Sequence, residues 1–564
     1  CCGADGEFRA EGMTRCPAHQ LEPFMKRSRI IRRALSALAL AVPLALAGCS
    51  KEQDGGGGAG DNTLIFVVSA EPPSLDGHRE TTFATVHPTA PHYSVLVRVD
   101  PADPGSGRIV GDLAKTWEVS PDGKTYTFKL HPVVKFHDGS ALTSRDVLAS
   151  LNKIVFPPEG VVSIRKSYYT MVESITAPDP ATVVVRLKFA TPAFLPALAQ
   201  PFNYIYSADK LAEDIHWYEK NVMGSGPFRM VEYTPGGYWR GVRFEDYFRP
   251  GLPKLDGFEA IFAPKENVRL QAIRGGRAMI EFRGFSPQGR DDLVRALGDR
   301  IRVQESPWNC GVFLAPNARK KPFDDVRVRK ALSLALDRWE GSRYLSKIAI
   351  VKSVAGVVFP GHPLAMSRED LQQFPGYWPD IEASRAEARR LLKEAGVPEG
   401  YRFRLHNRGV DQPYKIVGTW VIDQWRQVGL DVEQWVQQTG PFFQTLTHDP
   451  PEFDVSIDFN CGAVVNPTID ISKFISADRS DSNYLRYTDR ELDRLYDAQL
   501  KETDFDKQRA LLLQFERRLL AEKVHYIMLY WFHRIIPHHA KVKGWEIGPS
   551  HYLNQDLATV SIEE

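Results

Sequence analysis

Hydrophobic and polar positions alternate with a period of two along parts of this 564-residue chain, which is the pattern of half-buried β-strands. Residues 113–119 and 126–130 predict two such strands, and the Ser-Pro-Asp-Gly sequence at 120–123 predicts the tight turn between them. A helix should follow, because Thr143 is a natural N-cap and Asp146 places a carboxylate in its first turn. We therefore predict a hairpin followed by a capped helix.

Helical and strand patterns alternate further along the chain. Residues 322–332 predict an amphipathic helix that opens with two aspartates, and its apolar stripe consists of Val328, Ala331, Leu332 and Ala335. Later segments predict helices at 386–396 and 419–428 and strands at 401–405 and 430–436, and an earlier strand is predicted at 63–68. This alternation is typical of an α/β fold.

The N-terminal part carries an export signal. Residues 25–48 combine five Lys/Arg residues with an apolar run too short to span a bilayer comfortably. The run closes on Leu-Ala-Gly-Cys, which resembles a bacterial lipobox and implies that Cys49 is diacylated and becomes the first mature residue. The alternative is an ordinary signal peptide with a nearby cysteine.

The segments before and after this signal differ in composition and in the role that we expect for them. Residues 1–24 lack an initial Met, and we interpret them as sequence upstream of a start at Met25; a functional N-terminal extension is the alternative. Residues 49–61 are Gly-rich and charged, which predicts a flexible tether. No later stretch is apolar for 18 residues.

Composition narrows the class of protein. The length exceeds what a single core usually holds, so two or more lobes are expected. Hydrophobic residues make up 43% and charged residues 25%, as in ordinary globular proteins. Without the cationic leader the formal net charge is −2, with no basic block, so nucleic acid is not an expected partner.

One long stretch identifies a family. Residues 111–147, GDLAKTWEVSPDGKTYTFKLHPVVKFHDGSALTSRDV, resemble the signature of the bacterial extracellular solute-binding proteins of family 5, the peptide and nickel binders of ABC importers. Further blocks resemble the family at 71–76, 224–228, 250–256 and 322–332, although Gly77 stands where proline is usual. The resemblance covers essentially residues 62–564.

This resemblance implies an α/β, two-lobed periplasmic-binding-protein fold (type II-like, cluster C) with a ligand cleft between the lobes and an extra subdomain in the first lobe. Lobe I would comprise residues 62–308 and 530–564, and lobe II residues 309–529. The chain would cross between the lobes near residues 308–315 and 529–536, which would form the hinge.

Catalytic motifs are missing from the sequence. There is no His-Glu-x-x-His, Gly-x-Ser-x-Gly, Cys-x-x-Cys or Walker loop, and Ser163-Ile-Arg-Lys166 fits Ser-x-x-Lys without its partner motifs. His533, His538 and His539 cluster, with metal binding as the alternative to a hydrogen-bonded role. We expect no enzyme activity, cofactor or metal.

Two cysteines remain after the leader and Cys49, namely Cys310 and Cys461. An even pair in an exported protein favours a disulfide. Their offsets from the neighbouring motifs are similar to those of the bridged pair in the oligopeptide-binding branch. Two free buried thiols are the alternative.

At one position this sequence differs from the pattern of the family. In peptide-binding members an aspartate two residues after the second cysteine holds the α-ammonium of the ligand, and here that position is Ala463. A buried ammonium without a paired anion is costly, so a free peptide N-terminus is disfavoured as the ligand. Asp458 or Asp470 could supply the anion from a neighbouring position.

We expect the ligand to be a modified peptide, an opine-like conjugate or a glycoside. The cleft is predicted to use polar and aromatic side chains from four places in the chain. These are Glu80, Thr81, Phe83, His406, Arg408, Asp411, Asn460, Ala463, Asn466 and Trp531.

The function that follows is a lipid-anchored receptor, periplasmic or at the cell surface, that captures a peptide-like or other small polar solute by hinge closure and delivers it to an ABC permease and ATPase. A monomer is expected. The alternatives are a sensor or chaperone on the same fold and, from another class, a hydrolase or transferase.

Overall fold

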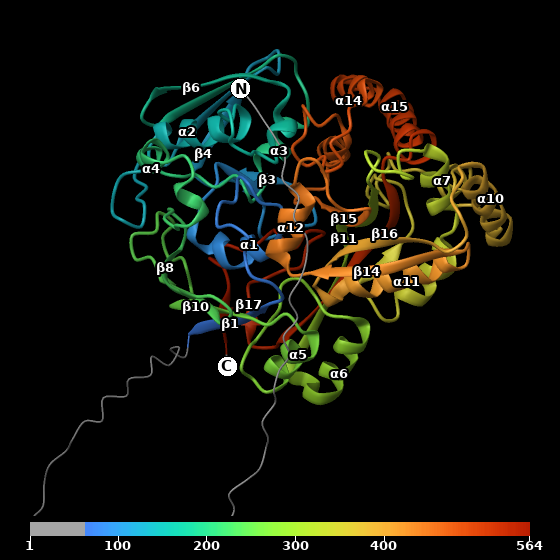
Figure 1. Ribbon diagram of the computed structural model, residues 1–564. Coiled ribbons are helices and arrows are strands. Elements are labelled where there is room, and N and C mark those ends of the chain that lie inside the picture. Colours follow the sequence, from blue (N-terminus) through green and yellow to red (C-terminus); the bar gives the residue numbers. More distant parts are fainter. Residues whose placement is uncertain (1–61, 564) are drawn as a thin grey trace, which may run out of the picture. The chain divides into compact units, whose positions relative to one another are not determined.

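Three β-sheets of four or more strands organise residues 62–563, which are the residues that the computed structural model describes (Figure 1). The predicted signal, Cys49 and the Gly-rich tether lie outside the described residues. The described residues belong to one compact unit.

The first sheet contains the predicted strand at 63–68, and its order is β1-β10-β9-β8. Its strands are β1 (Thr63–Val68), β8 (Phe228–Thr234), β9 (Tyr238–Arg243) and β10 (Gly257–Phe262). β1 pairs with β10 in parallel, and the other pairs are antiparallel. The Gly-Ser-Gly-Pro-Phe block ends in β8, and a Cβ at Gly226 would lie 2.4 Å from the backbone of His92, so only glycine fits there.

The predicted hairpin and capped helix are confirmed. The second sheet has the order β4-β5-β7-β6, formed by β4 (Ala114–Val119), β5 (Thr125–Leu130), β6 (Val172–Asp179) and β7 (Thr182–Leu187). Gly123 has a φ of +69° in the turn between β4 and β5. Helix α2 (Ser144–Val155) begins with a capping box between Thr143 and Asp146.

The third sheet is mixed and has six strands in the order β12-β16-β11-β15-β13-β14. They are β11 (Ile301–Pro316), β12 (Val351–Ser353), β13 (Tyr401–Arg408), β14 (Leu430–Gln437), β15 (Val455–Cys461) and β16 (Ile527–His539). The antiparallel register of β11 and β16 shifts between Pro307 and Gly311. This irregularity lies beside the first predicted chain crossing.

Helices surround these sheets. In the first part of the chain they are α1 (Phe83–Thr89), α3 (Phe194–Leu198), α4 (Ala208–Glu213), α5 (Glu266–Arg274) and α6 (Pro287–Leu297). After β11 follow α7 (Val326–Leu334), α8 (Arg338–Leu345), α9 (Arg368–Leu371), α10 (Ile381–Glu394), α11 (Ile416–Arg426), α12 (Thr439–Thr447), α13 (Pro467–Asp470), α14 (Arg490–Lys501) and α15 (Phe505–Arg517). Two short ribbons pair β2 (Val97–Val99) with β3 (Ile109–Gly111) and β17 (Val542–Lys543) with β18 (Ser561–Ile562).

Three helix starts differ from the prediction. Helix α7 begins at Val326 rather than at 322, because the Asp325 side chain caps it by accepting a bond from the backbone N–H of Arg327. Helix α10 begins at Ile381 rather than at 386, because the Asp380 carboxylate caps it by accepting bonds from the backbone N–H groups of Glu382 and Ala383. Helix α11 begins at Ile416 rather than at 419, directly after one turn of π-helix at Asp411–Lys415.

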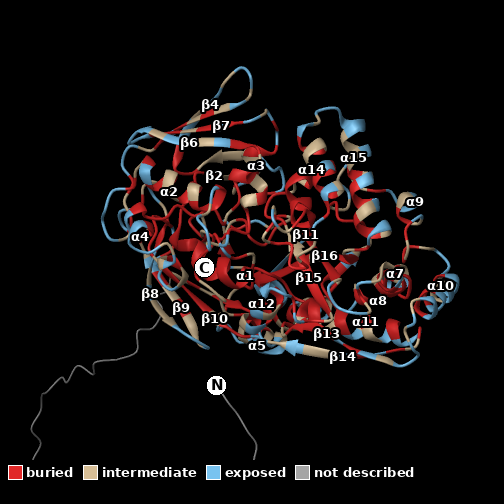
Figure 2. Ribbon diagram, turned by 45° about the horizontal axis from the view of Figure 1, so that its top comes forward, coloured by how far each residue is buried: buried red, intermediate tan, exposed pale blue. Residues whose placement is uncertain are grey.

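The core is continuous through most of the described chain. Figure 2 shows β15, β16 and the second half of β11 as buried, whereas α10, α14 and α15 carry exposed faces. Trp239, Trp308 and Trp425 are among the largest fully buried side chains. No helix in residues 62–563 is both long and apolar enough to cross a membrane.

Candidate functional site

A cavity of about 520 Å³ lies between two groups of segments that are distant in the sequence. One wall comes from residues 73–81, 162–164 and 219–220, and the other from α12 and residues 481–486. The predicted division would assign these walls to lobe I and lobe II. Glu80 and Thr81, both predicted as site residues, line this cavity.

A smaller cavity of about 20 Å³ shares Thr81, Ile164 and Tyr484 with the larger one. Its walls again join the two halves of the chain, with Arg165 and Phe202 on one side and residues 459–461 on the other. The predicted residue Asn460 lines it, with its side-chain amide donating to the carbonyl oxygen of Asp470 at 2.8 Å. The two cavities together define the cleft.

A larger cavity of about 940 Å³ lies elsewhere, between α8 and α11. All its lining residues fall between Asp337 and Gln434, within one of the two predicted lobes. A ligand there would not be enclosed by the movement of one lobe toward the other. The cleft therefore fits the site expected from the sequence better.

Glu80 gives the cleft a carboxyl group that burial keeps protonated. Its residue is 8% exposed, and desolvation raises the pKa of the carboxyl to about 8 against the attraction of Arg79, Arg165 and Arg408. Arg165 contributes differently, because its guanidinium donates to the carbonyl oxygens of Gly77 and His78 at 3.0 and 3.3 Å. That bond network fixes the loop that presents Glu80.

Arg408 ends β13 and bonds to Thr82 from the first half of the chain, although neither residue lines the two cavities. Its Nη2 donates to the Oγ1 of Thr82 at 3.1 Å, and its Nε donates to the Oγ1 of Thr439 at 3.1 Å. The guanidinium is fully buried, and desolvation lowers its pKa to about 10. It lies over Phe83, 5.1 Å from the ring centroid, so two predicted site residues are in contact.

Arg283, which no local sequence pattern marks, lies near Arg408 but lines neither cavity. It lies in an irregular segment between α5 and α6, and its guanidinium lies over the same Phe83 ring at 4.7 Å. Burial lowers its pKa, and Tyr414 opposes this shift. Its position depends on long-range packing, which no local pattern reports.

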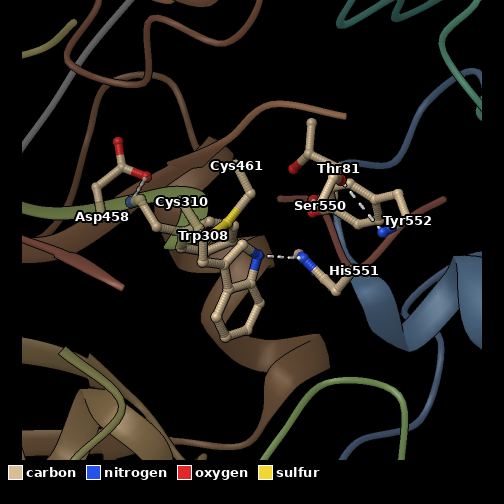
Figure 3. The surroundings of a disulfide bond; sticks show 9 residues. Thr81, Trp308, Cys310, Asp458, Cys461, Ser550, His551 and Tyr552 are labelled. Atoms are coloured by element: carbon tan, nitrogen blue, oxygen red, sulfur yellow. Dashed lines mark hydrogen bonds between the residues drawn. A yellow bond between two sulfur atoms is a disulfide. The ribbon is translucent and has the colours of Figure 1, made fainter. Parts of the chain in front are cut away.

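Neutral histidines lie beside these guanidinium groups. The Trp308 Nε1–H donates to Nδ1 of His551 at 2.8 Å, and Figure 3 shows the two rings pointing toward each other. Burial lowers the pKa of His87 to about 3, and that of His551 also lies well below its usual value. Tyr552, next to His551, donates its hydroxyl to the carbonyl oxygen of Thr81 at 2.6 Å. This contact ties the C-terminal segment to the cleft.

Several predicted site residues do not line either cavity. His406 is stacked under Phe442 of α12 and bonds to Ser456 and Gln437, so α12 covers it. The Trp531 Nε1–H donates to the carbonyl oxygen of Gly356 at 2.9 Å, which directs the indole toward the 356–359 segment.

Two further predicted residues have local structural roles. Asp411 pairs with Lys415 at 2.5 Å on the π-helical turn before α11. Asn466 caps α13, accepting from the Ile469 N–H at 3.1 Å.

The position expected to hold an α-ammonium carries no acid. Ala463 is 1% exposed. Asp458 forms a buried ion pair with Lys473 at 3.0 Å, and Asp470 accepts a bond from the Asn309 side chain at 3.2 Å. Neither aspartate lines the two cavities. Both alternative anchors are therefore engaged within the protein.

Cys310 and Cys461 lie opposite each other on β11 and β15 and are joined as a disulfide (Figure 3). Cys461 lines the smaller cavity, so the bond holds one wall of the cleft. Within residues 62–563 no group of three or more His, Cys, Asp or Glu residues could hold a metal ion. His533 instead bonds to Glu305 at 3.0 Å.

Comparison with known proteins places this geometry in a family. Residues 108–480 match the profile of the bacterial extracellular solute-binding proteins, family 5 Middle. The glutathione-binding protein GsiB of Pectobacterium atrosepticum is 31% identical over 343 residues, 59% of this chain and 62% of that protein. The di/tripeptide-binding protein 1 of Pseudomonas aeruginosa is 26% identical over 543 residues, 89% of this chain and 93% of that protein. The match thus spans about three fifths of the length of GsiB.

Solved structures share the fold. The binding protein AgaA from A. tumefaciens R10 in complex with agropinic acid has a TM-score of 0.77 and 23% identity, covering 89% of this chain and 99% of that one. DppA from Helicobacter pylori in complex with the peptide STSA has a TM-score of 0.76 and 22% identity, covering 89% and 98%. The expected two-lobed periplasmic-binding-protein fold is therefore confirmed. With a profile match over most of its length, the chain belongs to the bacterial extracellular solute-binding proteins of family 5.

Proposed function

We propose that this protein is the solute receptor of an ABC importer, which captures a small polar, peptide-like solute in the cleft and delivers it to a permease and its ATPase. The observation that carries the proposal is the cavity of about 520 Å³ with walls from both halves of the chain. Small-molecule sites are typically concave and form where domains meet.

The mechanism is hinge closure about β11 and β16. A ligand in the cleft would contact both walls only when the lobes are closed, so binding shifts the equilibrium toward the closed form. The Arg408–Thr82 bond, across 326 positions of sequence, is a contact that closure would make. The relatives bind glutathione, di- and tripeptides and agropinic acid by name. Modified peptides and opine-like conjugates are the first candidates for the solute here, because Ala463 stands where an anchor for a peptide α-ammonium is expected.

The test begins with the solute itself. The purified protein is partly unfolded and refolded to strip bound solute, and the released extract is identified by mass spectrometry. Returning the extract should raise Tm and decrease the radius of gyration measured by small-angle X-ray scattering. An extract that changes neither quantity would contradict the receptor function. An activity screen addresses the hydrolase alternative, and neighbouring permease and ATPase genes distinguish transport from a sensor or chaperone role.

Anchoring by lipid belongs to the same proposal. Cys49→Ser should release the mature protein from membranes and abolish incorporation of labelled fatty acid, because the thiol is the acylated group. Cys310→Ser is the matched control, since it removes a cysteine from the described fold and leaves the lipobox intact. Unchanged fractionation and labelling of the Cys49 variant would refute acylation at this residue.

A further inference from the structure

The cavity of about 940 Å³ between α8 and α11 has an apolar and aromatic floor. Large hydrophobic side chains from both helices and from residue 348 form it, namely Tyr344, Leu345, Ile348, Ile416, Trp420 and Ile422. Two of them are open to solvent, since Tyr344 is 57% exposed and Ile348 37%. The volume and the lining are those of a small-molecule site.

A glycine brings α8 close to a pair of aromatic rings at this cavity. A Cβ on Gly341 would lie 2.2 Å from the Tyr530 hydroxyl and 2.5 Å from Cζ2 of Trp420, so a larger residue would displace both rings. The two rings lie edge to face, 5.4 Å apart. Tyr530 is 0% exposed, and within residues 62–563 its hydroxyl has no hydrogen-bond partner. An unsatisfied polar group therefore lies directly behind the wall that Gly341 forms.

One charged residue of the lining is not paired. Asp337 accepts the backbone N–H of Glu340 through Oδ1 at the start of α8. Within residues 62–563 its Oδ2 accepts no hydrogen bond, and the carboxylate forms no ion pair. The other charged lining residues are all paired: Glu340 with Arg343, Arg385 with Glu382 at 3.2 Å, and Asp423 with Arg426 at 3.5 Å.

The arginines near Asp337 are engaged with other groups. Arg338 does not line the cavity and donates to the carbonyl oxygens of Met528 and Ser333 at 2.7 and 3.0 Å. Arg385 donates to Oε1 of Gln424 at 3.0 Å, in addition to its pairing with an acid.

The Asp337 carboxylate lies near the phenol of Tyr530. Burial raises the pKa of Tyr530 well above its usual value; Arg338 opposes the shift, and the charge of Asp337 adds to it. A negative charge without a partner therefore lies beside the aromatic wall of the cavity. Such an arrangement favours a ligand that carries a positive charge.

We propose that this cavity is a second ligand site, separate from the cleft, for a small organic cation, that is, an amine attached to an aromatic or aliphatic ring. The ring fills the space between Tyr344, Ile348 and Trp420, and the face of the indole attracts the cation. The ammonium donates a charge-assisted hydrogen bond to the Asp337 carboxylate. The inference does not depend on the proposed receptor function, because every lining residue lies within one predicted lobe.

Three ligands that share a phenyl ring and differ in charge test the ligand class. 2-Phenylethylamine, 2-phenylethanol and 3-phenylpropionate are added separately at equal ionic strength, and Kd is measured by isothermal titration calorimetry. The amine should bind about tenfold more tightly than the alcohol, as expected for a hydrogen bond to a charged group, and the acid should bind most weakly. No binding of the amine, equal Kd values for amine and alcohol, or tighter binding of the acid overturns the proposal.

Variants assign the binding to this cavity. Asp337→Asn removes the charge while asparagine still caps α8, so Tm of the ligand-free protein should stay nearly unchanged and the amine should lose about tenfold in affinity. Asp380→Asn is the matched control, because it makes the same change at the cap of α10, outside the cavity, and should keep the wild-type Kd. Wild-type affinity in Asp337→Asn, or an equal loss in Asp380→Asn, overturns the assignment.

The apolar part of the site has its own variant. Tyr344→Ser, at an exposed position of α8, should weaken the amine and the alcohol by the same factor, because it removes part of the floor and leaves the charge in place. Unchanged affinity for both ligands in this variant would place them elsewhere and contradict the proposed site.

Occupancy of the cleft separates this site from the receptor site. The extract released from the purified protein should leave the Kd of the amine unchanged, because the cavity and the cleft share no lining residue. Competition between extract and amine would place the amine in the cleft and overturn the second site. An extract that changes neither Tm nor the radius of gyration contradicts the receptor function but leaves the response to the amine intact, so the two proposals fail independently.

Discussion

Burial, more than any single partner, shifts the pKa values of Glu80 in the cleft and of Arg408 and His551 outside the two cavities. Glu80, Arg408 and His551 all have pKa values displaced toward the uncharged form, and desolvation is the largest cause in each case. Of these three residues only Glu80 lines a cavity, where it offers a carboxyl group with a raised pKa.

Glu80→Gln should change how stability depends on pH. The folded pKa of about 8 exceeds the ordinary value of 4.5, so the folded state holds a proton that the unfolded state releases above pH 4.5. Stability from this group is therefore complete below pH 4.5 and is lost as the pH rises toward 8, at about 1.4 kcal/mol per pKa unit. The variant should have the higher Tm at pH 8, with the difference from wild type shrinking toward pH 5.

Glu80 is not the only buried acid with a raised pKa, since Asp470 and Glu516 both have values of about 7. The difference between wild type and variant at each pH isolates Glu80 from these two. Asp470→Asn provides a second curve for comparison. Parallel Tm curves for wild type and Glu80→Gln from pH 5 to 8 would show that Glu80 titrates normally.

At the scale of elements, β11 and β15 connect the core of the six-stranded sheet to the cleft. The Cys310–Cys461 bond joins these neighbouring strands, and it lies directly after the register shift between β11 and β16. The bond closes a loop with a sequence separation of 151. It therefore restricts the conformations that residues 310–461 can adopt in the unfolded chain.

Removing the bond by Cys310→Ala with Cys461→Ala should lower the free energy of unfolding by about 5 kcal/mol in the chain-entropy model. Chemical denaturation of oxidised wild type and of the double variant measures the difference. Alkylation of the denatured, non-reduced protein followed by mass spectrometry checks the pairing. Two alkylated cysteines under those conditions would contradict it.

Local patterns predicted the elements whose causes are local. The hairpin β4–β5 and the capping box of α2 follow from alternation, a Pro-Asp-Gly turn and a Thr–Asp pair three residues apart. The start of α10 was missed because a polar first turn hides it from the apolar pattern. The predicted site residues were also placed correctly only in part. Glu80, Thr81 and Asn460 line a cavity, whereas His406 and Trp531 are packed against other segments.

Arg283 shows what a single sequence leaves open. It lies outside every helix and strand, so no periodicity marks it. Its surroundings are formed by Phe83 and Tyr414, residues 200 positions before and 131 after it. Its acidic neighbour Glu281 is paired with Arg269. Such a group is recognised only when distant segments are placed together.

At the scale of the whole molecule, the specificity for a ligand depends on which charged groups of that ligand the cleft can pair with groups of opposite charge. The position that would hold an α-ammonium is Ala463, which is buried. Asp458 is paired with Lys473, and desolvation lowers the pKa of that lysine while raising that of the aspartate. Among the described residues that line the cleft, Glu219 and Asp481 are paired with Arg79 and Lys166, and burial raises the pKa of the Glu80 carboxyl to about 8. An ammonium that entered the cleft would therefore meet no unpaired ionised carboxylate there at neutral pH.

Unmodified di-, tri- and tetrapeptides are accordingly expected not to stabilise the protein, because their α-ammonium would be buried without a paired anion. A ligand at about 100 times its Kd adds about 2.7 kcal/mol, so a thermal-shift panel detects binding readily. Trialanine and N-acetyl-trialanine form the matched pair, since only the ammonium differs, and the acetylated form should give the larger shift. Strong stabilisation by trialanine that disappears in Asp458→Asn, Asp470→Asn or Glu80→Gln would instead identify that carboxylate as the ammonium anchor and contradict the role assigned to Ala463.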